Sequence, residues 1–420
     1  MINDWLVKFE KSIKEKDIDA ILDLFDKETY WRDLISFTWN IITLESKDDI
    51  SLMLNKTIDK INPENFKIQE MLTSNSDVHE ARFTFETITS NCIGHIRLIN
   101  GKCKTLLTLT DSLKDYEENK GYKRELGTEF GFFKDRKNWL ENRNIEIQNL
   151  EENKNPYCLI VGGGQGGIAL AARLRQLNVP TIVIDKNQKP GDSWRDRYHS
   201  LCLHDTVWYD HMPYLPFPDH WPIFSPKDKI GDWLEMYTKI MEINYWGSTE
   251  CLNASYDQKK QTWEVIADRE GQEIKLTPRH LILATGMSGM PQFPDIKNID
   301  KFNGDYCHSS GFKNGLEYRG KNAVIVGSNN SAHDIAAELW EQGAANVTMI
   351  QRSYTTVAKS KTLTELSNNG VYSENAARAG ITTNIADITV ASTPYKLIHV
   401  DGQKTVKKLK DIDKQFYTKL

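Results

Sequence analysis

The sequence predicts an α+β N-terminal domain followed by two α/β units in tandem. Two stretches, 158–185 and 323–353, each contain an apolar strand, a turn of small residues, a helix and a second strand. Ahead of them, apolar residues at helical spacing precede segments in which apolar and polar residues alternate. These periods are typical of amphipathic helices and half-buried strands. We therefore expect domains at 1–150, 155–295 and 296–420.

The first 150 residues carry the helix and strand patterns of the α+β domain. Trp5, Phe9 and Ile13 recur at helical spacing, whereas 81–86 alternates apolar and polar residues. The segments 92–98 and 104–110 have the character of further strands. Helices followed by such strands predict a curved sheet wrapped on helices. The charged segment 115–156 predicts a linker or a solvated helix.

The first α/β unit opens with the apolar strand 158–161 and a turn that contains five glycines. Gly162, Gly164 and Gly167 occupy the positions of a G-x-G-x-x-G motif. The first allows a tight turn, the second lets the backbone approach a pyrophosphate, and the third lets the helix pack closely on the strand. The free N–H groups at the helix start would face the phosphate.

An acid follows the second strand of this unit at the place where a ribose is bound. Asp185 lies roughly 20 residues beyond the glycines, where a carboxylate accepts hydrogen bonds from ribose hydroxyls. Gly166 and Lys186 complete the predicted dinucleotide ligands here. A glycine-rich loop without a ligand is the alternative, which the order of strand, turn, helix, strand and acid disfavours.

The second α/β unit repeats this order with a modified turn. Asparagine or serine stands where the second glycine belongs, and asparagine tolerates positive φ better than most residues. A guanidinium at the end of the second strand favours the 2′-phosphate of NADPH. A surface arginine is the alternative for that residue. The predicted ligands are Gly327, Ser328, Asn330, Ser331, Arg352 and Ser353.

Composition narrows the class of protein. The net charge of −5 gives no electrostatic case for nucleic acid or for an anionic membrane as a partner. The six cysteines form no C-x-x-C, so we expect neither a redox dithiol nor a metal site, and a disulfide reductase is disfavoured. We see no signal peptide and no apolar run that spans a bilayer. A cytoplasmic protein is the expectation.

Three further segments carry a family resemblance. These are Pro190–Arg195, Tyr198–Asp205 and Ala284–Gly286, and the pattern F-x-G-x-x-x-H-x-x-x-F follows at 302–312. With the two glycine turns, they make the chain resemble the class B flavin-dependent monooxygenases of the flavin-containing monooxygenase superfamily, and most of all the indole-3-pyruvate monooxygenase branch. The resemblance implies FAD in the first unit and NADPH in the second.

The resemblance also implies roles for individual residues. Ser193, Trp194 and Arg195 would pack near the flavin, with a core tryptophan as the alternative for Trp194. His204 would lie beside the flavin ring as a catalytic residue, followed by the ligand Asp205; a buried structural histidine is the alternative. His308 would orient the reaction or join the nucleotide domains. The strand that passes beneath the flavin would contribute Thr285 and Gly286.

The N-terminal run Tyr30–Leu34 with Phe37–Asn40 resembles the SnoaL-like cone domains found in some long flavoprotein oxidoreductases. Some cone-fold proteins are enzymes with an Asp/His pair, so Asp33 with His79 or His95 is one interpretation. The alternative, an ion-paired Asp33 and histidines on a solvent face of the sheet, is favoured because nothing in the sequence joins these residues. Cone folds often dimerise, so a homodimer is a candidate assembly.

The implied chemistry is NADPH-dependent oxygenation of a small organic substrate by O₂ through a C4a-peroxyflavin. Relatives of this kind continue beyond the counterpart of Leu420 and return to the flavin domain. We therefore expect either a separately encoded C-terminal segment or a truncated chain. The alternatives are an NAD(P)H-flavin oxidase or reductase that releases H₂O₂, and a non-catalytic remnant whose cone domain binds a ligand or partner.

Overall fold

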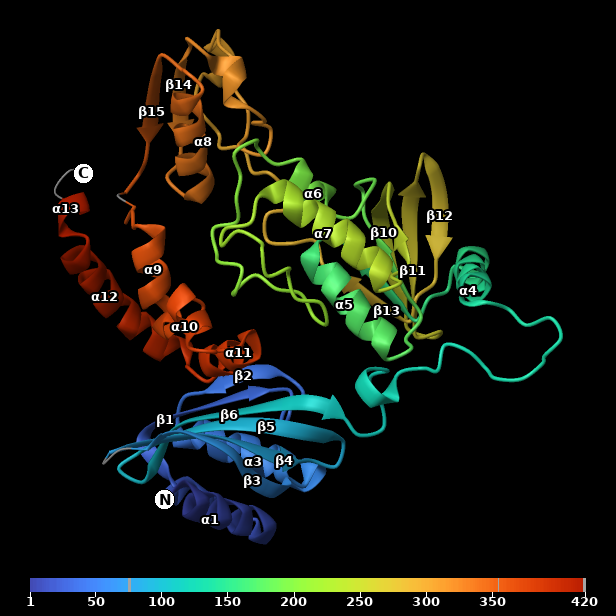
Figure 1. Ribbon diagram of the computed structural model, residues 1–420, viewed down its shortest axis with the longest axis vertical. Helices are drawn as coiled ribbons and strands as arrows, with labels where there is room; N and C mark the ends of the chain where they lie inside the picture. The colour runs from blue at the N-terminus through green and yellow to red at the C-terminus, as the bar shows by residue number, and fades with distance from the viewer. Residues whose placement is uncertain (75–76, 354, 418–420) are drawn as a thin grey trace. The chain divides into compact units, whose positions relative to one another are not determined.

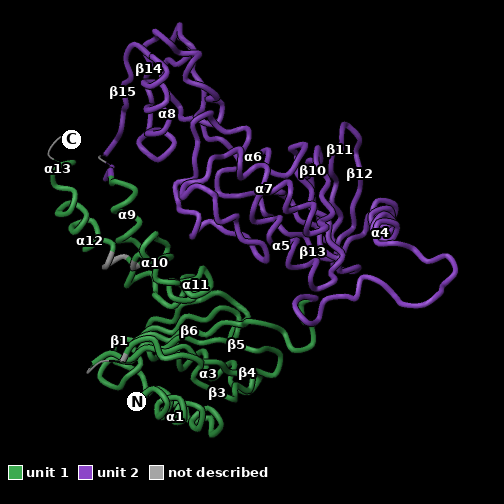
Figure 2. Tube along the Cα trace, viewed as in Figure 1, with its two compact units in different colours: residues 1–118, 358–420 green, residues 119–357 purple. Residues whose placement is uncertain are grey.

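The computed structural model describes residues 1–74, 77–353 and 355–417. The chain forms two compact units, one made of 1–118 with 358–420 and the other of 119–357 (Figure 2). The division of the sequence into domains at 1–150, 155–295 and 296–420 stays a prediction. No helix among the described residues is both long enough and apolar enough to cross a membrane.

The first unit is built on a six-stranded sheet with the order β2-β1-β6-β5-β4-β3 (Figure 1). Strands β1 and β6 are parallel, and the other neighbouring pairs are antiparallel. The predicted strands at 81–86, 92–98 and 104–110 are confirmed within β4, β5 and β6. The strands are β1 Phe25–Leu34, β2 Ile41–Leu44, β3 Glu64–Ser74, β4 Val78–Glu86, β5 Ser90–Ile99 and β6 Lys102–Leu113.

Three helices cover one face of this sheet and close an aromatic core. They are α1 Ile2–Glu15, α2 Ile18–Asp23 and α3 Lys47–Ile61. Trp5 and Phe9 of α1 stack with ring centroids 4.8 Å apart, and both belong to the buried cluster that the strands complete. In that cluster the ring of Phe83 lies directly over Gly94, its partner on β5. A Cβ at Gly94 would lie 2.0 Å from this ring, so any larger residue there would have to displace the buried Phe83.

Asp33 is a structural residue of this core. Its side chain is fully buried and accepts hydrogen bonds from the N–H groups of Phe37 and Thr38 and from the hydroxyls of Ser36, Thr38 and Thr108. The carboxylate therefore holds the turn that follows β1. A buried charge is tolerated when donors surround it in this way.

The strand register separates Asp33 from the two histidines. Asp33 pairs with Thr108, whereas His95 pairs with the neighbouring Leu107, so the two side chains project from opposite faces of the sheet. His79 lies four positions along β4 from the row that contains Asp33 and three strands away from it. Four positions correspond to about 13 Å of strand. The structure therefore does not form the Asp/His pair.

His95 instead belongs to a polar cluster on the sheet face opposite α1, α2 and α3. Its Nε2 lies 3.0 Å from Glu80 Oε1, which also accepts a hydrogen bond from Arg97 at 2.7 Å. Burial of the Glu80 carboxyl opposes ionisation, but the hydrogen bond with His95 and the charge of Arg97 outweigh it and lower the pKa of Glu80 to about 2.

The C-terminal residues of the first unit are helical. Arg32 on the sheet donates a hydrogen bond to the carbonyl of Ala391 at 3.2 Å, and Lys396 forms an ion pair with Glu45. These contacts join the C-terminal helices to the sheet. The helices are α9 Ser360–Leu366, α10 Glu374–Arg378, α11 Thr383–Ala391, α12 Tyr395–Ile412 and α13 Lys414–Tyr417.

The second unit contains a parallel sheet with the order β13-β7-β8-β9. Alternate residues of the strands face two different layers. Ile160 and Val183 pack against α5 and α7, whereas Leu159 and Ile182 pack against an antiparallel sheet. These elements are β7 Cys158–Val161, α5 Gln165–Gln176, β8 Thr181–Ile184, α7 Lys227–Ile240, β9 Tyr245–Trp246, β10 Thr249–Asp257, β11 Thr262–Arg269, β12 Gln272–Leu276 and β13 His280–Leu283.

The helix α4, Trp139–Asn153, confirms the solvated helix predicted within 115–156. It has no buried residue, and a reciprocal cap between Asn138 and Glu141 starts it. The second nucleotide motif forms a smaller part of the same unit. Strands β14 Asn322–Val326 and β15 Asn346–Ile350 are parallel, and α8 Asn330–Glu341 packs on them. Its core joins Ile335 and Leu339 of α8 to Tyr198 and Leu201.

We expect Asp33→Asn to destabilise the first unit by about 2–4 kcal/mol, because it removes charge-assisted acceptors and presents an amide to two N–H donors. Urea unfolding monitored by tryptophan fluorescence measures this effect. Asp26→Asn is the matched control, since Asp26 on the same strand accepts one hydrogen bond, from the N–H of Glu28. Equal losses in the two variants would contradict the structural role of Asp33.

Candidate functional site

The glycine turn between β7 and α5 combines two glycines that packing requires with two that face open space. A Cβ at Gly162, where φ is +111°, would lie 2.4 Å from the carbonyl oxygen of Ala284. A Cβ at Gly167 would lie 2.0 Å from the carbonyl oxygen of Gly162. Nothing stands within 4 Å of a Cβ at Gly164 or Gly166. The turn is therefore tightly packed on its inner side and open on its outer side.

The start of α5 offers unpaired backbone donors on that open side. Gly164 is the N-cap residue and has no side chain to accept from the first turn. The N–H groups of a helix's first turn have no partner within the helix and carry the positive end of its dipole. Such a site fits a phosphate group.

Asp185 fixes the shape of the glycine turn. Its Oδ2 accepts the N–H of Gly163 at 2.6 Å, and its Oδ1 accepts the N–H of Asn187 at 2.8 Å. Each carboxylate oxygen keeps a second lone pair, so a ribose hydroxyl can still donate to it. Lys186, the next predicted ligand, is exposed.

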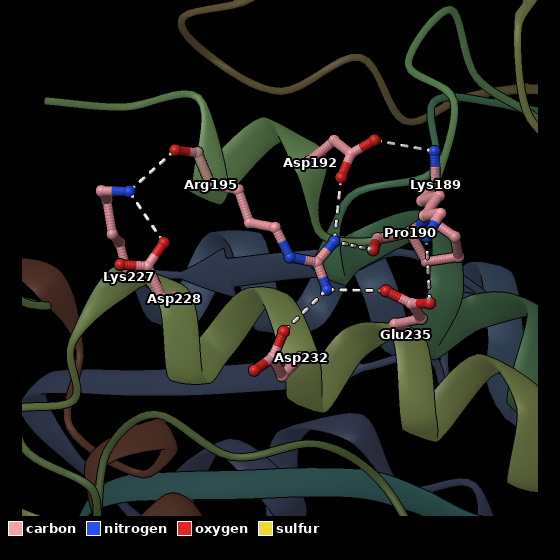
Figure 3. A network of polar contacts seen from close by, with 8 residues as sticks. All are labelled: Lys189, Pro190, Asp192, Arg195, Lys227, Asp228, Asp232 and Glu235. Atoms are coloured by element: carbon pink, nitrogen blue, oxygen red, sulfur yellow. Dashed lines mark hydrogen bonds and ion pairs between the residues drawn. The ribbon is translucent and has the colours of Figure 1, made fainter. Parts of the chain in front are cut away.

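Arg195 is held by acidic residues, as Figure 3 shows. Its guanidinium donates to Asp192 at 2.9 Å within α6, Asp192–Arg195, and to Asp232 at 3.0 Å and Glu235 at 2.7 Å on α7. Lys227 donates to the carbonyl of Arg195 at 2.7 Å. These contacts give Arg195 a structural role. Its role as a cofactor ligand stays a prediction.

The rest of the predicted flavin-proximal motif lies around α6. Trp194 is half-buried, packs in two hydrophobic clusters and donates from Nε1 to Gln165 Oε1 at 3.2 Å, next to the glycine turn. Ser193 is exposed. Thr285 and Gly286 follow β13, which pairs with β7, so they lie beside the glycine turn; both are exposed, and φ of Gly286 is +77°.

The second nucleotide motif presents a comparable turn before α8. Gly327 has a φ of +130° and nothing within 4 Å of a Cβ, and the hydroxyl of Thr355 donates to Ser328 Oγ at 2.8 Å. Ser331 follows Asn330 in the first turn of α8. Arg352 and Ser353 follow β15 after one intervening residue and are exposed.

His204 is brought to the second motif by a contact that sequence spacing does not reveal. Its Nε2 lies 2.8 Å from Asp334 Oδ2, and its Nδ1 lies 3.0 Å from Asn330 Nδ2. His308 is engaged locally, because its Nδ1 accepts the N–H of Ser310 at 3.2 Å. The catalytic roles of both histidines stay predictions.

Asp210 is a perturbed acid near His204 that the sequence analysis missed. Burial, and then the charge of the exposed Asp205, raise the pKa of Asp210 to about 6, while His211 and His204 act in the opposite direction. Acids with raised pKa values often lie at functional sites. The only sequence signal for this site was that Asp205 and Asp210 lie five positions apart next to His204. Whether the two acids come close together depends on the fold.

We expect Gly167→Ala to destabilise the second unit by about 1–3 kcal/mol, because its methyl group would collide with the carbonyl of Gly162. Gly166→Ala is the matched control in the same helix turn. Its methyl group enters open space, and we expect stability to be unchanged or to rise by up to about 1 kcal/mol. Thermal unfolding of both variants without added nucleotide measures the difference. Similar melting temperatures would refute the close packing of α5 on β7.

We expect Asp210→Asn to stabilise the protein above pH 6 and to lose this advantage below about pH 4. The folded pKa of Asp210 lies above its unfolded value, so the wild-type carboxyl weakens the fold as it ionises with rising pH. Solvent screening of this half-buried group leaves an effect of about 1 kcal/mol. Urea midpoints of both proteins between pH 3.5 and 8 test the prediction. A pH-independent difference would contradict it.

Comparison with known proteins finds relatives for about half of the chain. The chain is 32% identical over 202 residues to indole-3-pyruvate monooxygenase YUCCA1 of Oryza sativa subsp. japonica, which covers 48% of this chain and 49% of the relative. It is 30% identical over 197 residues to probable indole-3-pyruvate monooxygenase YUCCA9 of Arabidopsis thaliana, covering 46% and 47%. The chain thus spans about half the length of the curated relatives it matches.

Solved structures include a flavin-containing monooxygenase from Stenotrophomonas maltophilia, at 23% identity and a TM-score of 0.44, covering 48% of this chain and 59% of the other. A cyclohexanone monooxygenase bound to ε-caprolactone matches at 20% identity and a TM-score of 0.44, covering 49% and 41%. A family model described as pyridine nucleotide-disulphide oxidoreductase matches residues 159–412, well over half of the chain. The glycine turns, the parallel sheet and this match together show that the chain belongs to the pyridine nucleotide-disulphide oxidoreductase family.

Proposed function

We propose that this chain is an FAD- and NADPH-dependent monooxygenase that oxygenates a small organic substrate. The observation that carries the proposal is the glycine turn, in which Gly164 and Gly166 face open space while packing locks Gly162 and Gly167. A helix N-terminus behind such a turn fits a dinucleotide pyrophosphate. Relatives named as indole-3-pyruvate monooxygenases support oxygen transfer as the reaction.

In this proposal, the first motif binds FAD. The N–H groups at the start of α5 bind the pyrophosphate, and Asp185 accepts hydrogen bonds from a ribose while it holds the glycine turn. Trp194, whose indole donates to Gln165 beside that turn, orients the cofactor. Bound FAD supplies the redox chemistry, and the protein binds it, orients it and excludes water.

The second motif binds NADPH in this proposal. Gly327 leaves the backbone open before α8, and Asn330 and Ser331 stand in the first turn of that helix. Arg352, exposed just after β15, attracts the 2′-phosphate that distinguishes NADPH from NADH. The exchange Arg352→Glu would therefore be expected to reverse this preference.

An NAD(P)H-flavin oxidase is the competing function, and one observation favours it. Both ring nitrogens of His204 are engaged, by Asp334 and by Asn330. A ring held in this way has no nitrogen free to act on a flavin, so reduced flavin would pass its electrons to O₂ and release H₂O₂. A disulfide reductase is not favoured, since all six cysteines are free and no two form a C-x-x-C.

The proposal extends to the first unit and to the assembly. The six-stranded sheet covered by α1, α2 and α3 supports a SnoaL-like cone domain. We propose that this domain mediates homodimerisation. The buried, fully bonded Asp33 argues against catalysis by the cone domain.

The test begins with the absorbance spectrum of the purified protein after reconstitution with FAD. We expect a bound flavin spectrum in the wild type and an affinity for FAD at least about tenfold lower in Gly164→Val, since a side chain there fills the pyrophosphate space. The backbone of Gly164, with φ of −77°, accepts valine. Unfolding of the nucleotide-free variant should match that of the wild type.

Turnover separates the two functions. NADPH oxidation is followed with indole-3-pyruvate as the test substrate, with product and H₂O₂ measured together. NADPH consumption matched by oxygenated product supports the monooxygenase, and consumption matched by H₂O₂ alone supports the oxidase. A wild-type protein that folds yet binds no FAD would exclude both.

A further inference from the structure

The segment 191–204 joins two helices of the second unit that the sequence separates by about a hundred residues. At one end, Arg195 is tied to Asp232 and Glu235 of α7 (Figure 3). Gly191 approaches that helix so closely that a Cβ there would lie 2.2 Å from the carbonyl oxygen of Gly231. At the other end, the segment is tied to α8. Its position therefore depends on α8 of the second motif and on α7, which packs against α5 of the first motif.

A carboxylate of α8 holds the middle of the segment. Glu338 is buried, and its Oε2 accepts hydrogen bonds from both the N–H and the hydroxyl of Ser200. Its Oε1 accepts the N–H of Gly315 at 3.0 Å. Because every oxygen of this buried acid has a donor, the contact fixes the backbone near Ser200 to α8.

A second carboxylate, one turn earlier on α8, holds His204. Asp334 Oδ2 accepts the hydroxyl of Tyr198 at 2.6 Å and lies 2.8 Å from His204 Nε2. Burial, and then the hydrogen bond to Asp334, raise the pKa of Tyr198, so the tyrosine remains a donor. Tyr198 therefore holds in place the same Asp334 oxygen that His204 contacts.

The two neighbours of His204 select one form of its ring. Asn330 Nδ2 is a donor, so Nδ1 of His204 accepts from it. Asp334 is an acceptor, so Nε2 carries the proton and donates. The neutral tautomer protonated on Nε2 satisfies both contacts at once.

We propose that Asp334 is a positioning residue for His204, and that Asn330 is shared between His204 and the phosphate of the nicotinamide nucleotide. The first half rests on the contacts alone, and the second rests on the proposed function. Asn330 stands in the first turn of α8, where a phosphate would compete with His204 for its amide hydrogens. Nucleotide binding at α8 then weakens the hydrogen bond from Asn330 to Nδ1 of His204, while Asp334 keeps the imidazole ring in place.

This arrangement links the second motif to the residue predicted to lie beside the flavin. Without nucleotide, Asn330 occupies Nδ1 and Asp334 occupies Nε2. When the amide turns to a phosphate, Nδ1 becomes free to accept a proton or a hydrogen bond. Through one shared amide, the nucleotide thus controls a side chain of the segment 191–204, which lies outside the second motif.

The test uses nitrogen NMR of full-length protein labelled at histidine. In the nucleotide-free wild type we expect His204 to show a protonated Nε2 and a hydrogen-bonded, unprotonated Nδ1. Asp334→Asn should shift this equilibrium towards a mixture of tautomers, since an amide can turn either a donor or an acceptor towards the ring. Glu338→Gln is the matched control, because Glu338 lies on the same helix as Asp334 and its exchange loosens Ser200 but leaves the partners of His204 in place. His204→Phe assigns the signals.

Titration with NADP⁺ tests the shared amide. We expect the Nδ1 resonance to move towards that of a free nitrogen in the wild type, and His204→Phe to bind NADP⁺ about fivefold more tightly because it removes a competing hydrogen bond. A wild-type Nδ1–H tautomer, or tautomer signals that respond equally to Asp334→Asn and Glu338→Gln, would overturn the positioning role. NADP⁺ that binds without changing Nδ1 would overturn the sharing. An intact tautomer pattern with no NADP⁺ binding would overturn the proposed function and leave the positioning role standing.

Discussion

The nucleotide-binding unit depends on one close approach of backbone to backbone. Strand β7, the start of α5 and the end of β13 meet at Gly162 and Gly167 with no side chain between them. A methyl group at either glycine would penetrate a neighbouring carbonyl. This contact leaves the N–H groups of the first turn of α5 without a partner inside the helix, where the proposed pyrophosphate would bind. Asp185 then holds the turn from the other side.

A second constraint connects the two nucleotide motifs. The segment 191–204 is fixed to α7 through Arg195 and to α8 through Tyr198, Ser200 and His204. Trp194 packs in the hydrophobic clusters of both motifs. Buried or half-buried carboxylates accept these hydrogen bonds. The segment 191–204 is therefore held in one specific geometry, which apolar contact alone would not impose. The residues nearest the proposed flavin are therefore positioned by the motif proposed to bind NADPH.

The first unit shows how a residue pattern can suggest chemistry that the fold does not assemble. Asp33 has the surroundings of a buried structural acid, with backbone and hydroxyl donors on both oxygens. His95 projects from the opposite face of the sheet and meets Glu80. A shift of one residue along a strand reverses the face, so residues on strands paired one position apart cannot share a site.

Local features were predictable from the sequence because they depend on neighbours in the chain. Glycine spacing, alternation and helical periodicity correctly indicated the strands β4, β5 and β6 of the N-terminal sheet and the βαβ order of both motifs, with Gly162, Gly164 and Gly167 in the turn of the first motif. These signals arise from φ/ψ preference and from the periods of helices and strands.

Tertiary structure alone decided which distant side chains meet. Two of the three acids that bind Arg195 lie 37 and 40 positions along the chain from it, and Asp334 lies 130 positions from His204. The raised pKa of Asp210 also depends on burial that no local pattern encodes. The sequence by itself determined the strand–turn–helix conformation of both motifs, because backbone conformation is local. The fold decided which side chains surround those places, because burial, register and the meeting of charges are set by the packing of elements far apart in the chain.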